Sequence, residues 1–281
     1  DAGLFKAKKE LIFSTDTSVE NIHFPKGLNA KKIAYRSCAV AASDIAACGG
    51  ALKWLAISLS TSSKDEKWIE DFSKGVREFS DSYKVPIIGG DLTSGKEISI
   101  SIGVCGEIEK KHFMRRSGAQ ENDHIFVTGD LGEAFIGLNL LKNKAKKLSS
   151  KEKIYLNRFL RPSIEIAFSQ DLSKLANSCI DISDGLLGDL KHICEESNLG
   201  AKIFLEDIPF IGEYKNALTC GDDYQLCFTA SSKNLERIYK IARNHKIKLS
   251  TIGSMKKSKG ISVFSNGKKM AIQKAGYNHF K

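Results

Sequence analysis

Five aspartates stand within or directly after apolar stretches of this sequence, and their placement restricts the fold more than any other feature. Asp44 lies on the same helical face as Ala41 and Cys48, and Asp181 stands between two isoleucines. A carboxylate that is buried without a partner is energetically costly. The chain must therefore fold so that these acids share cations. The five are Asp16, Asp44, Asp91, Asp181 and Asp184.

The apolar residues alternate with period two in some segments and recur with helical spacing in others. A basic, polar stretch at residues 109–116 separates two halves that each mix both patterns. We predict an α/β (α+β) fold with two mixed α/β domains, residues 1–110 and residues 111–281. Strands are expected at 11–15, 52–59, 85–88, 98–104, 124–128 and 179–182, and helices at 31–48, 64–83, 132–141, 163–177 and 186–194.

Composition indicates a cytoplasmic protein without a membrane span. The longest apolar run, residues 38–59, is interrupted by Asp44 and Lys53, whereas a spanning helix needs roughly 20 apolar residues. The seven cysteines form no Cys-x-x-Cys pair, which favours buried thiols over a disulfide or zinc framework. No basic-then-apolar leader is present, so no signal peptide is expected. The absence of an initiator Met leaves open whether Asp1 is the natural start.

The net charge of +10 raises the question of a nucleic-acid partner. The lysines are spread over several short clusters, and aromatic residues are not interleaved with them as stacking platforms. A solvated, lysine-rich surface is the favoured interpretation, and we expect no nucleic acid. The positive field would also help to attract an anionic substrate.

Each acid has a plain structural alternative when taken alone. Ser183 or Asp184 could cap a helix that begins at Gly185, Asp91 could be a turn residue beside its glycines, and Asp16 could end a strand in solvent. Asp44 has the weakest alternative. As a set, the acids favour Mg²⁺, which prefers oxygen ligands and is commonly shared between carboxylates and substrate phosphates. Hydroxyl oxygens beside the acids could add to the site, from Ser14, Thr15 and Ser183.

A phosphate-binding loop of the Gly-x-x-x-x-Gly-Lys type almost occurs at residues 90–96. The next residue is Glu97 instead of Ser or Thr, and residues 97–102 alternate like a strand instead of opening a helix. Without a helix N-terminus the loop lacks its phosphate donors, so we reject this motif. Phosphoryl transfer by positioning and charge neutralisation, without a protein nucleophile, suits an acid-rich site.

Seven segments together resemble the thiamine-monophosphate kinases, a family within the superfamily that includes aminoimidazole ribonucleotide synthetase and selenophosphate synthetase. The segments follow the family's order and extend over nearly the whole chain, which makes the set far more specific than any one of them. They are Ser14–Thr17 with His23-Phe24, Ala41–Gly49, Gly89–Thr93, Arg115–Ala119 with Val127–Gly129, Ile180–Gly185, Gly221–Tyr224 and Gly276–Phe280.

The resemblance implies an aminoimidazole ribonucleotide synthetase-like fold, a homodimer formed through the first domain, and transfer of the γ-phosphate of ATP to thiamine monophosphate. It implies several Mg²⁺ ions shared by Asp1, Ser14, Thr15, Asp16, Asp44, Asp91 and Asp181, with Asp184 on a further ion. The acids expected at the reacting phosphates are Asp16, Asp44, Asp91 and Asp181. ATP would be held by Gly90, Asp91, Arg116 and Ser183, and thiamine monophosphate by His23, Asp222 and Tyr277.

Three departures from the family pattern bear on these roles. The family usually has Gly-Glu-Asp-Tyr where this chain has Asp222, the segment between Phe210 and Leu218 is short, and the first metal-binding turn is incomplete at Asp1. His23 beside Phe24, Tyr277 as a core aromatic and Asp222 as a turn acid are the plain alternatives. Competing functions are a relative acting on an aminoimidazole precursor or selenide, a basic nucleic-acid-binding protein without activity, and a paralogue that binds thiamine phosphates without catalysis.

Overall fold

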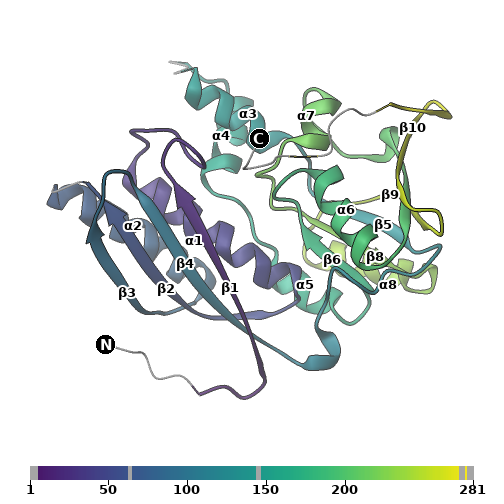
Figure 1. The fold of residues 1–281 in the computed structure, drawn as a ribbon, viewed down its shortest axis with the longest axis horizontal. Coiled ribbons are helices and arrows are strands. Elements are labelled where there is room, and N and C mark those ends of the chain that lie inside the picture. The colour runs from purple at the N-terminus through teal and green to yellow at the C-terminus, as the bar shows by residue number, and fades with distance from the viewer. Residues whose placement is uncertain (1–5, 63–64, 144–146, 272–275, 277–281) are drawn as a thin grey trace.

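The computed structural model describes residues 6–62, 65–143, 147–271 and 276. Two predicted site residues, Asp1 and Tyr277, lie outside these described residues. In the part that is described, the chain forms a mixed α/β fold with two sheets and a long helix between them (Figure 1). No helix in the described ranges is long and apolar enough to cross a membrane.

The first sheet has four strands in the order β1-β4-β2-β3. Strand β4 pairs antiparallel with both β1 and β2, and β3 pairs parallel with β2 at the outer edge. Because side chains alternate across a sheet, each row of paired residues points to one face. The bounds are β1 Glu10–Val19, β2 Ala51–Thr61, β3 Ile87–Ser94 and β4 Ser99–Ile108.

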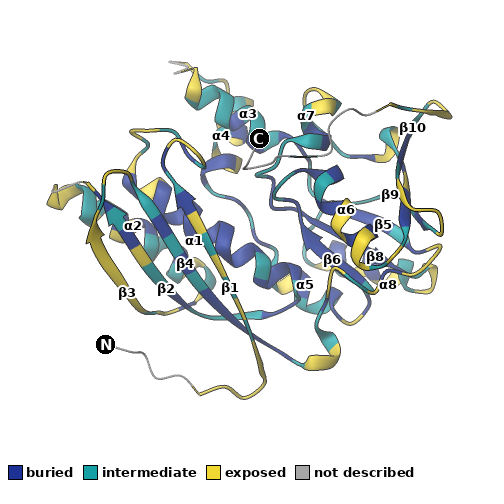
Figure 2. Ribbon diagram, in the orientation of Figure 1, coloured by how far each residue is buried: buried dark blue, intermediate teal, exposed yellow. Residues whose placement is uncertain are grey.

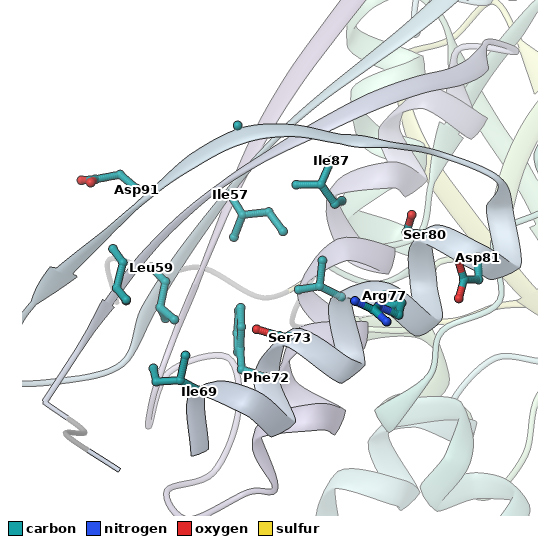
Figure 3. A pocket seen from close by; sticks show the side chains of 13 residues that line it. Ile57, Leu59, Ile69, Phe72, Ser73, Arg77, Ser80, Asp81, Ile87 and Asp91 are labelled. Atoms are coloured by element: carbon teal, nitrogen blue, oxygen red, sulfur yellow. The ribbon is translucent and has the colours of Figure 1, made fainter. Parts of the chain in front are cut away.

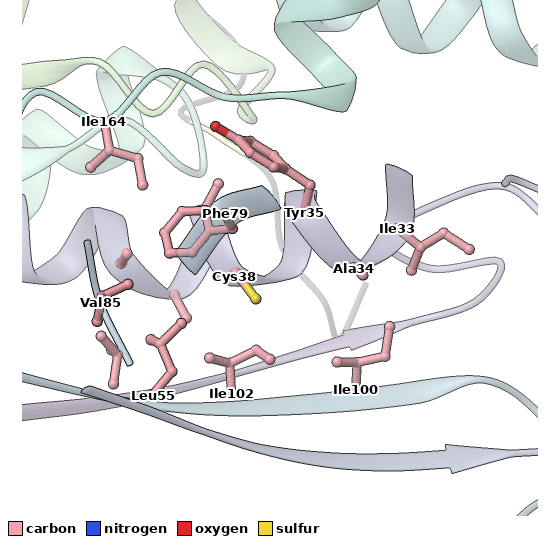
Figure 4. Close-up of a cluster of buried hydrophobic side chains, with 14 of the residues drawn as sticks. Ile33, Ala34, Tyr35, Cys38, Leu55, Phe79, Val85, Ile100, Ile102 and Ile164 are labelled. Carbon is pink, nitrogen blue, oxygen red and sulfur yellow. The ribbon is translucent and has the colours of Figure 1, made fainter. Parts of the chain in front are cut away.

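Two helices cover one face of this sheet, α1 (Ala30–Ala47) and α2 (Glu66–Tyr83). The side chain of Asn29 caps α1 and that of Asp65 caps α2, each accepting a backbone N–H of the first turn. Gly75 permits their close approach, since a Cβ there would lie 2.1 Å from the carbonyl oxygen of Lys31. Apolar side chains from both helices and the sheet form the core between them (Figure 4).

The second sheet has seven strands in the order β11-β10-β7-β9-β5-β8-β6. Both faces are covered: α6 and α7 pack with one apolar cluster and α5 and α8 with another. The strands are β5 His124–Thr128, β6 Ser178–Asp181, β7 Gly200–Phe204, β8 Leu226–Ala230, β9 Leu249–Lys256, β10 Gly260–Ser265 and β11 Lys268–Lys269. The helices are α3 Glu133–Lys142, α4 Ser150–Leu160, α5 Ile166–Leu172, α6 Leu186–Glu196, α7 Tyr214–Thr219 and α8 Leu235–Asn244, with 3₁₀ turns η1 Lys110–His112, η2 Leu205–Asp207 and η3 Ser232–Asn234.

Helix α1 is buried along most of its length and joins the two halves (Figure 2). It contacts β1, β2 and β4 of the first sheet, and also α4, α5 and β6 of the second half. Its alanine-rich sequence suits this position, because small side chains let neighbouring elements approach closely on every side. The helix therefore brings residues from both halves to one place.

Several predicted elements differ from those observed. Strand β3 runs through Gly89, Gly90 and Asp91, where the sequence was expected to end the strand. Residues 163–177 form only the short helix α5. Helix α4 was not among the expected helices, and it begins with a capping box formed by Ser149 and Glu152. Residues 95–98 connect two strands without a helix, which agrees with rejecting the phosphate-binding loop.

Candidate active site

Ser14 and Asp16 of β1 lie on the face of the first sheet that α1 covers. The rows that contain them also contain the buried Val104 and Ile102. The Ser14 hydroxyl donates a hydrogen bond of 2.5 Å to Oδ2 of Asp44 on α1. Burial, and then the nearby Asp44 carboxylate, raise the pKa of Asp16. The structure thus brings together three predicted metal-site residues from β1 and α1.

Asp181 joins this group from the second sheet. It is the last residue of β6, is only 5% exposed, and accepts a 2.5 Å hydrogen bond from the Ser43 hydroxyl of α1. Burial first, and the Asp44 carboxylate second, raise the pKa of Asp181 to about 7. Consecutive residues of α1, Ser43 and Asp44, therefore contact an acid of β6 and a hydroxyl of β1.

The donors in this group fit a hard divalent cation. They are carboxylate and hydroxyl oxygens, and the raised pKa values of Asp16 and Asp181 show that the chain supplies too little positive charge to offset burial. Among the described residues, no three His, Cys, Asp or Glu side chains lie close enough to form a ready-made metal site. Carboxylate and hydroxyl oxygens suit Mg²⁺, which usually keeps several waters and takes one or two carboxylates plus substrate phosphates.

Arg116 stands beside the acids. It lines a cavity of about 370 Å³ together with Asp44 and Asp181, and its charge lowers the pKa of Asp181, against the larger effect of burial. The cavity is therefore lined by carboxylates and by a guanidinium. An anionic group bridged by a cation could be held there.

The turn between β6 and α6 carries Ser183 and Asp184, and another acid, Asp189, holds this turn in place. Asp189 of α6 is 2% exposed and accepts hydrogen bonds of 3.0 Å from the backbone N–H groups of both residues. Burial, and then the Asp181 carboxylate, raise the pKa of Asp189 to about 8. Helix α6 begins after Gly185 without a side-chain cap, so the capping alternative for Ser183 and Asp184 is wrong.

Asp189 was missed in the sequence, although a signal was present. It interrupts the apolar stripe that Leu186, Leu190 and Ile193 form along α6. Like Asp44 in α1, an acid in such a stripe indicates a buried carboxylate that needs a partner. Its backbone contacts now explain its burial.

Asp91 lies on the other face of the first sheet. It shares a row with Ser58, Ser101 and Thr17, whereas Asp16 is in the next row and points toward α1. Strand β3 is exposed along nearly all of its length. The structure therefore does not bring Asp91 together with the acids of β1, α1 and β6 within one chain.

Two other predicted site residues also lie on the first sheet, Thr15 on β1 and Gly90 on β3. The exposed side chain of Thr15 is on the same open face, two rows away. Gly90 lies against β2, where a Cβ would meet the carbonyl oxygen of Ile57 at 2.1 Å, so only glycine fits.

A cavity of about 760 Å³ lies between β2, β3 and α2 (Figure 3). Apolar side chains line most of it, including Ile57, Leu59 and Phe72. Asp91 is at its rim, and Figure 3 shows the carboxylate pointing away from those apolar side chains. The cavity thus has an apolar interior and an acid at its mouth.

Two of the predicted substrate residues, His23 and Asp222, lie within the described part of the chain. His23 is in the turn after β1, where its Nδ1 accepts a 2.9 Å hydrogen bond from the N–H of Val19. Its charge acts to lower the pKa of Asp16, against the larger effect of burial. Its neighbour Phe24 is buried. Asp222 lies between α7 and β8 and is bound by Arg36 of α1 at 2.5 Å. Arg36 was not singled out in the sequence.

The residues after Asp222 anchor this segment further. Asp223 is buried and accepts the backbone N–H of Gly132 with both carboxylate oxygens, at 3.0 and 2.9 Å. Burial raises the pKa of Asp223 to about 8, although these N–H donors act in the opposite direction. Gln225 accepts a hydrogen bond from the hydroxyl of Thr128. The segment therefore has a defined conformation.

Two protein-family models match this chain. The model of the AIR synthase related protein N-terminal domain matches residues 1–108, and that of the C-terminal domain matches residues 120–266. The thiamine-monophosphate kinase of Buchnera aphidicola subsp. Schizaphis graminum is 40% identical over 294 residues, covering 100% of this chain and 91% of its own length. That of Escherichia coli K12 is 36% identical, covering 97% and 87%.

The fold of this chain is also similar to solved structures. The thiamine-monophosphate kinase of Stenotrophomonas maltophilia K279a superimposes with a TM-score of 0.89 at 32% identity, covering 96% of this chain and 90% of its own. AaThiL complexed with AMPPCP and TMP gives a TM-score of 0.85 at 30% identity, covering 99% and 90%. From these matches, which extend over both halves of the molecule, the chain belongs to the thiamine-monophosphate kinase family of AIR synthase related proteins.

Proposed function

We propose that this protein transfers the γ-phosphate of ATP to thiamine monophosphate in a magnesium-dependent reaction. The observation that carries the proposal is the convergence of Asp16, Asp44 and Asp181 from three elements, in a chain of the thiamine-monophosphate kinase family. An oxygen of the acceptor phosphate attacks the γ-phosphorus, the bond to the β-bridging oxygen breaks, and ADP leaves with that electron pair. Thiamine diphosphate is the second product.

Several Mg²⁺ ions would be shared by Asp16, Asp44 and Asp181 together with the substrate phosphates, with the Ser14 hydroxyl beside them and Asp184 on the adjoining turn. When bound, the metal neutralises the charge of the reacting phosphates, which is the main requirement of phosphoryl transfer. The chain's own part is to hold these acids in place through Ser14 and Ser43. Asp189 does the same for the turn with Ser183 and Asp184.

ATP would extend between two places in the fold. The cavity behind β3 has the apolar walls that a nucleobase needs, with Gly90 and Asp91 beside it. Arg116 and Ser183 lie instead with the acid group near β6, where they suit the phosphates. Arg116 supplies a fixed positive charge there.

A homodimer through the first domain would reconcile these two places. The open face of the first sheet carries exposed apolar side chains, with Leu11 49% and Phe13 64% exposed. If two such faces stack with a two-fold axis parallel to the strands, β1 of one protomer faces β3 of the other. Asp91 and Thr15 then lie within the interface, and Asp91 approaches the partner's acids.

The acceptor would bind between the two halves of the chain. His23 near Asp16 and Asp222 beside α1 supply polar contacts on the predicted substrate side. Tyr277, which lies outside the described residues, stays a predicted third contact. We further propose that residues 1–110 form the ATP-, metal- and dimer-forming domain and residues 111–281 the domain that completes the site, and that the protein is cytoplasmic. The seven cysteines, all free in the structure, are in keeping with a reducing compartment.

The test is ADP formation from ATP and Mg²⁺ with thiamine monophosphate, run beside thiamine, an aminoimidazole precursor and selenide. We expect ADP only with thiamine monophosphate, and loss of the reaction when a chelator is added. Turnover with the aminoimidazole precursor or selenide instead would assign a different acceptor. Binding of thiamine monophosphate without any turnover would indicate a non-catalytic paralogue, and salt-sensitive binding to RNA or DNA would favour the basic binding protein.

A further inference from the structure

Arg36 is a buried cation at the junction of the two halves of the molecule. It is 3% exposed and lies on α1. Its Nη1 donates to the carbonyl oxygen of Phe159 in α4 at 2.6 Å, and its guanidinium carbon lies 4.0 Å from the centre of the Phe159 ring. Its Nη2 donates to Oδ1 of Asp222 at 2.5 Å. These contacts fix the guanidinium in one orientation.

Asp222 combines an uncommon backbone conformation with a carboxylate that is held through one oxygen. Its backbone has φ of +73°, a conformation that a non-glycine residue rarely adopts. Oδ1 accepts hydrogen bonds from Arg36 and from the Tyr224 hydroxyl, at 2.5 and 3.1 Å, and Oδ2 takes part in neither. The side chain remains 29% exposed. Oδ1 is thus tied to the protein, and part of the side chain can be reached from outside.

The same helix carries the acid group. Asp44 follows Arg36 by eight residues on α1, a rise of about 12 Å along the axis. Asp222 lies on a segment anchored to the second half through Asp223 and Gln225. Arg36 is therefore the link by which the helix that bears Asp44 sets the place of Asp222.

We propose that Arg36 is a positioning residue for the phosphate acceptor, which holds Asp222 so that its Oδ2 accepts a hydrogen bond from an N–H or O–H of that acceptor. This rests on the proposed function, in which Asp222 contacts thiamine monophosphate. Arg36 itself is too deeply buried to touch a ligand. It acts through Asp222.

The lengths of the two side chains explain why an arginine is needed. Asp222 stands where the resemblance leads us to expect the longer glutamate, and it therefore reaches one methylene less far. A planar guanidinium can bind Asp222 and Phe159 at once, whereas a lysine ammonium is a single point donor on a shorter stem. Arg36 and Asp222 form a matched pair, and Lys with Glu would be its nearest substitute.

The experiment compares Arg36→Lys with the double variant Arg36→Lys/Asp222→Glu. For each we would measure the thermal midpoint, the Kd for thiamine monophosphate by calorimetry, and the KM for both substrates. Arg36→Lys is expected to raise the Kd and KM for thiamine monophosphate about 10-fold, the effect of one weakened charged hydrogen bond. The KM for ATP should stay within about 2-fold. The longer carboxylate side chain of the double variant should restore most of the acceptor affinity.

Arg161→Lys is the matched control. Arg161 also forms an ion pair across the same junction, with Glu78, and lies 4.0 Å from the ring centre of Tyr35, but it does not contact Asp222. It should lower the thermal midpoint without changing acceptor affinity. If Arg36→Lys behaves the same way, or if the double variant shows no rescue, Arg36 has only a structural role and the proposal is overturned.

The calorimetric measurement separates this proposal from the proposed function. Wild-type protein that binds thiamine monophosphate without turnover would refute the kinase activity, while the Kd values of the variants would still support or overturn the role of Arg36. Wild-type protein that does not bind thiamine monophosphate would overturn both. Normal turnover with an unchanged acceptor KM in Arg36→Lys would overturn only the positioning role.

Discussion

The hydroxyl of Ser43 donates a 2.5 Å hydrogen bond to Oδ2 of Asp181, so helix α1 of the first half holds the end of strand β6 from the second. The next residue along α1, Asp44, accepts the hydroxyl of Ser14 from β1. Two adjacent positions of one helix therefore unite acids that are far apart in the sequence. The site depends on the place of α1 between the two sheets.

Replacement of Ser43 by Ala tests that connection. We expect Ser43→Ala to lower stability by about 1–2 kcal/mol, because a buried carboxylate loses its donor. The pKa of Asp181 should rise further, since the hydrogen bond from Ser43 acts to lower it. Thermal unfolding and the KM for Mg²⁺ measure these effects. Ser82→Ala is the control and should change neither, because Ser82 is exposed on α2 and its hydroxyl donates to the Glu78 carbonyl of the same helix.

Neutralising Asp44 separates the metal role from a structural one. Asp44→Asn keeps the shape and can still accept from Ser14, but it removes the negative charge that raises the pKa of Asp16 and of Asp181. In chelator we expect an unchanged or higher thermal midpoint, and with Mg²⁺ and ATP a fall in kcat of at least about 100-fold. Stabilisation of the protein by added Mg²⁺ should also weaken.

Asp171→Asn is the control for this prediction, because the Asp171 side chain is about half exposed and pairs with Lys174 and His245 away from the site. Its kcat and its response to Mg²⁺ should match wild type. Activity retained by Asp44→Asn at ordinary Mg²⁺ concentration would contradict a metal role for the acid group.

The acid group was predictable in part, and the reason lies in residue types. Asp16, Asp44 and Asp181 stand out because a carboxylate among apolar neighbours is costly, and that cost is visible in sequence. Asp91 stands out for the same reason, but pattern alone does not say that β3 is an edge strand or which face its acid occupies. Arg36 gave no signal, because an arginine in a lysine-rich chain looks like surface until its partner, 186 residues away, is known.

The buried carboxyl of Asp223 predicts a dependence of stability on pH. Its pKa in the folded protein is raised to about 8, above the value near 4 expected in the unfolded chain. The fold therefore favours the protonated form. The stabilising contribution of that form is complete below about pH 4 and is lost as the pH rises through about 8.

Asp223→Asn should remove this dependence, because an amide does not ionise. We expect the thermal midpoint of wild type to fall relative to that of the variant as the pH rises from 5 to 9, by the equivalent of a few kcal/mol. The difference between the two curves isolates Asp223 from Asp181 and Asp189, which titrate in both proteins. Parallel curves over this range would show that the hydrogen bonds from Gly132 keep the carboxylate ionised in the fold.

The open face of the first sheet leads to the last prediction. Phe13 is 64% exposed, and its ring centre lies 6.0 Å from that of Trp54 on the same face. In a dimer formed through this face, Phe13→Asp would bury an unpaired charge and dissociate the protomers. The isolated chain should keep its stability, because the side chain is exposed there. Activity should fall with dimer content, since Asp91 is on this face and the other acids are not.

Ile154→Asp provides a matched control for Phe13→Asp. Ile154 is also a large exposed apolar residue, at 54%, but it lies on α4, away from the open face of the first sheet (Figure 1). Sedimentation of both variants beside wild type, followed by assays at the same protein concentrations, measures the effect. A dimeric Ile154→Asp and a monomeric, inactive Phe13→Asp are expected. A monomeric wild type with full activity would instead require that one chain's own Asp91 serve its site, which the opposite faces of Asp91 and Asp16 oppose.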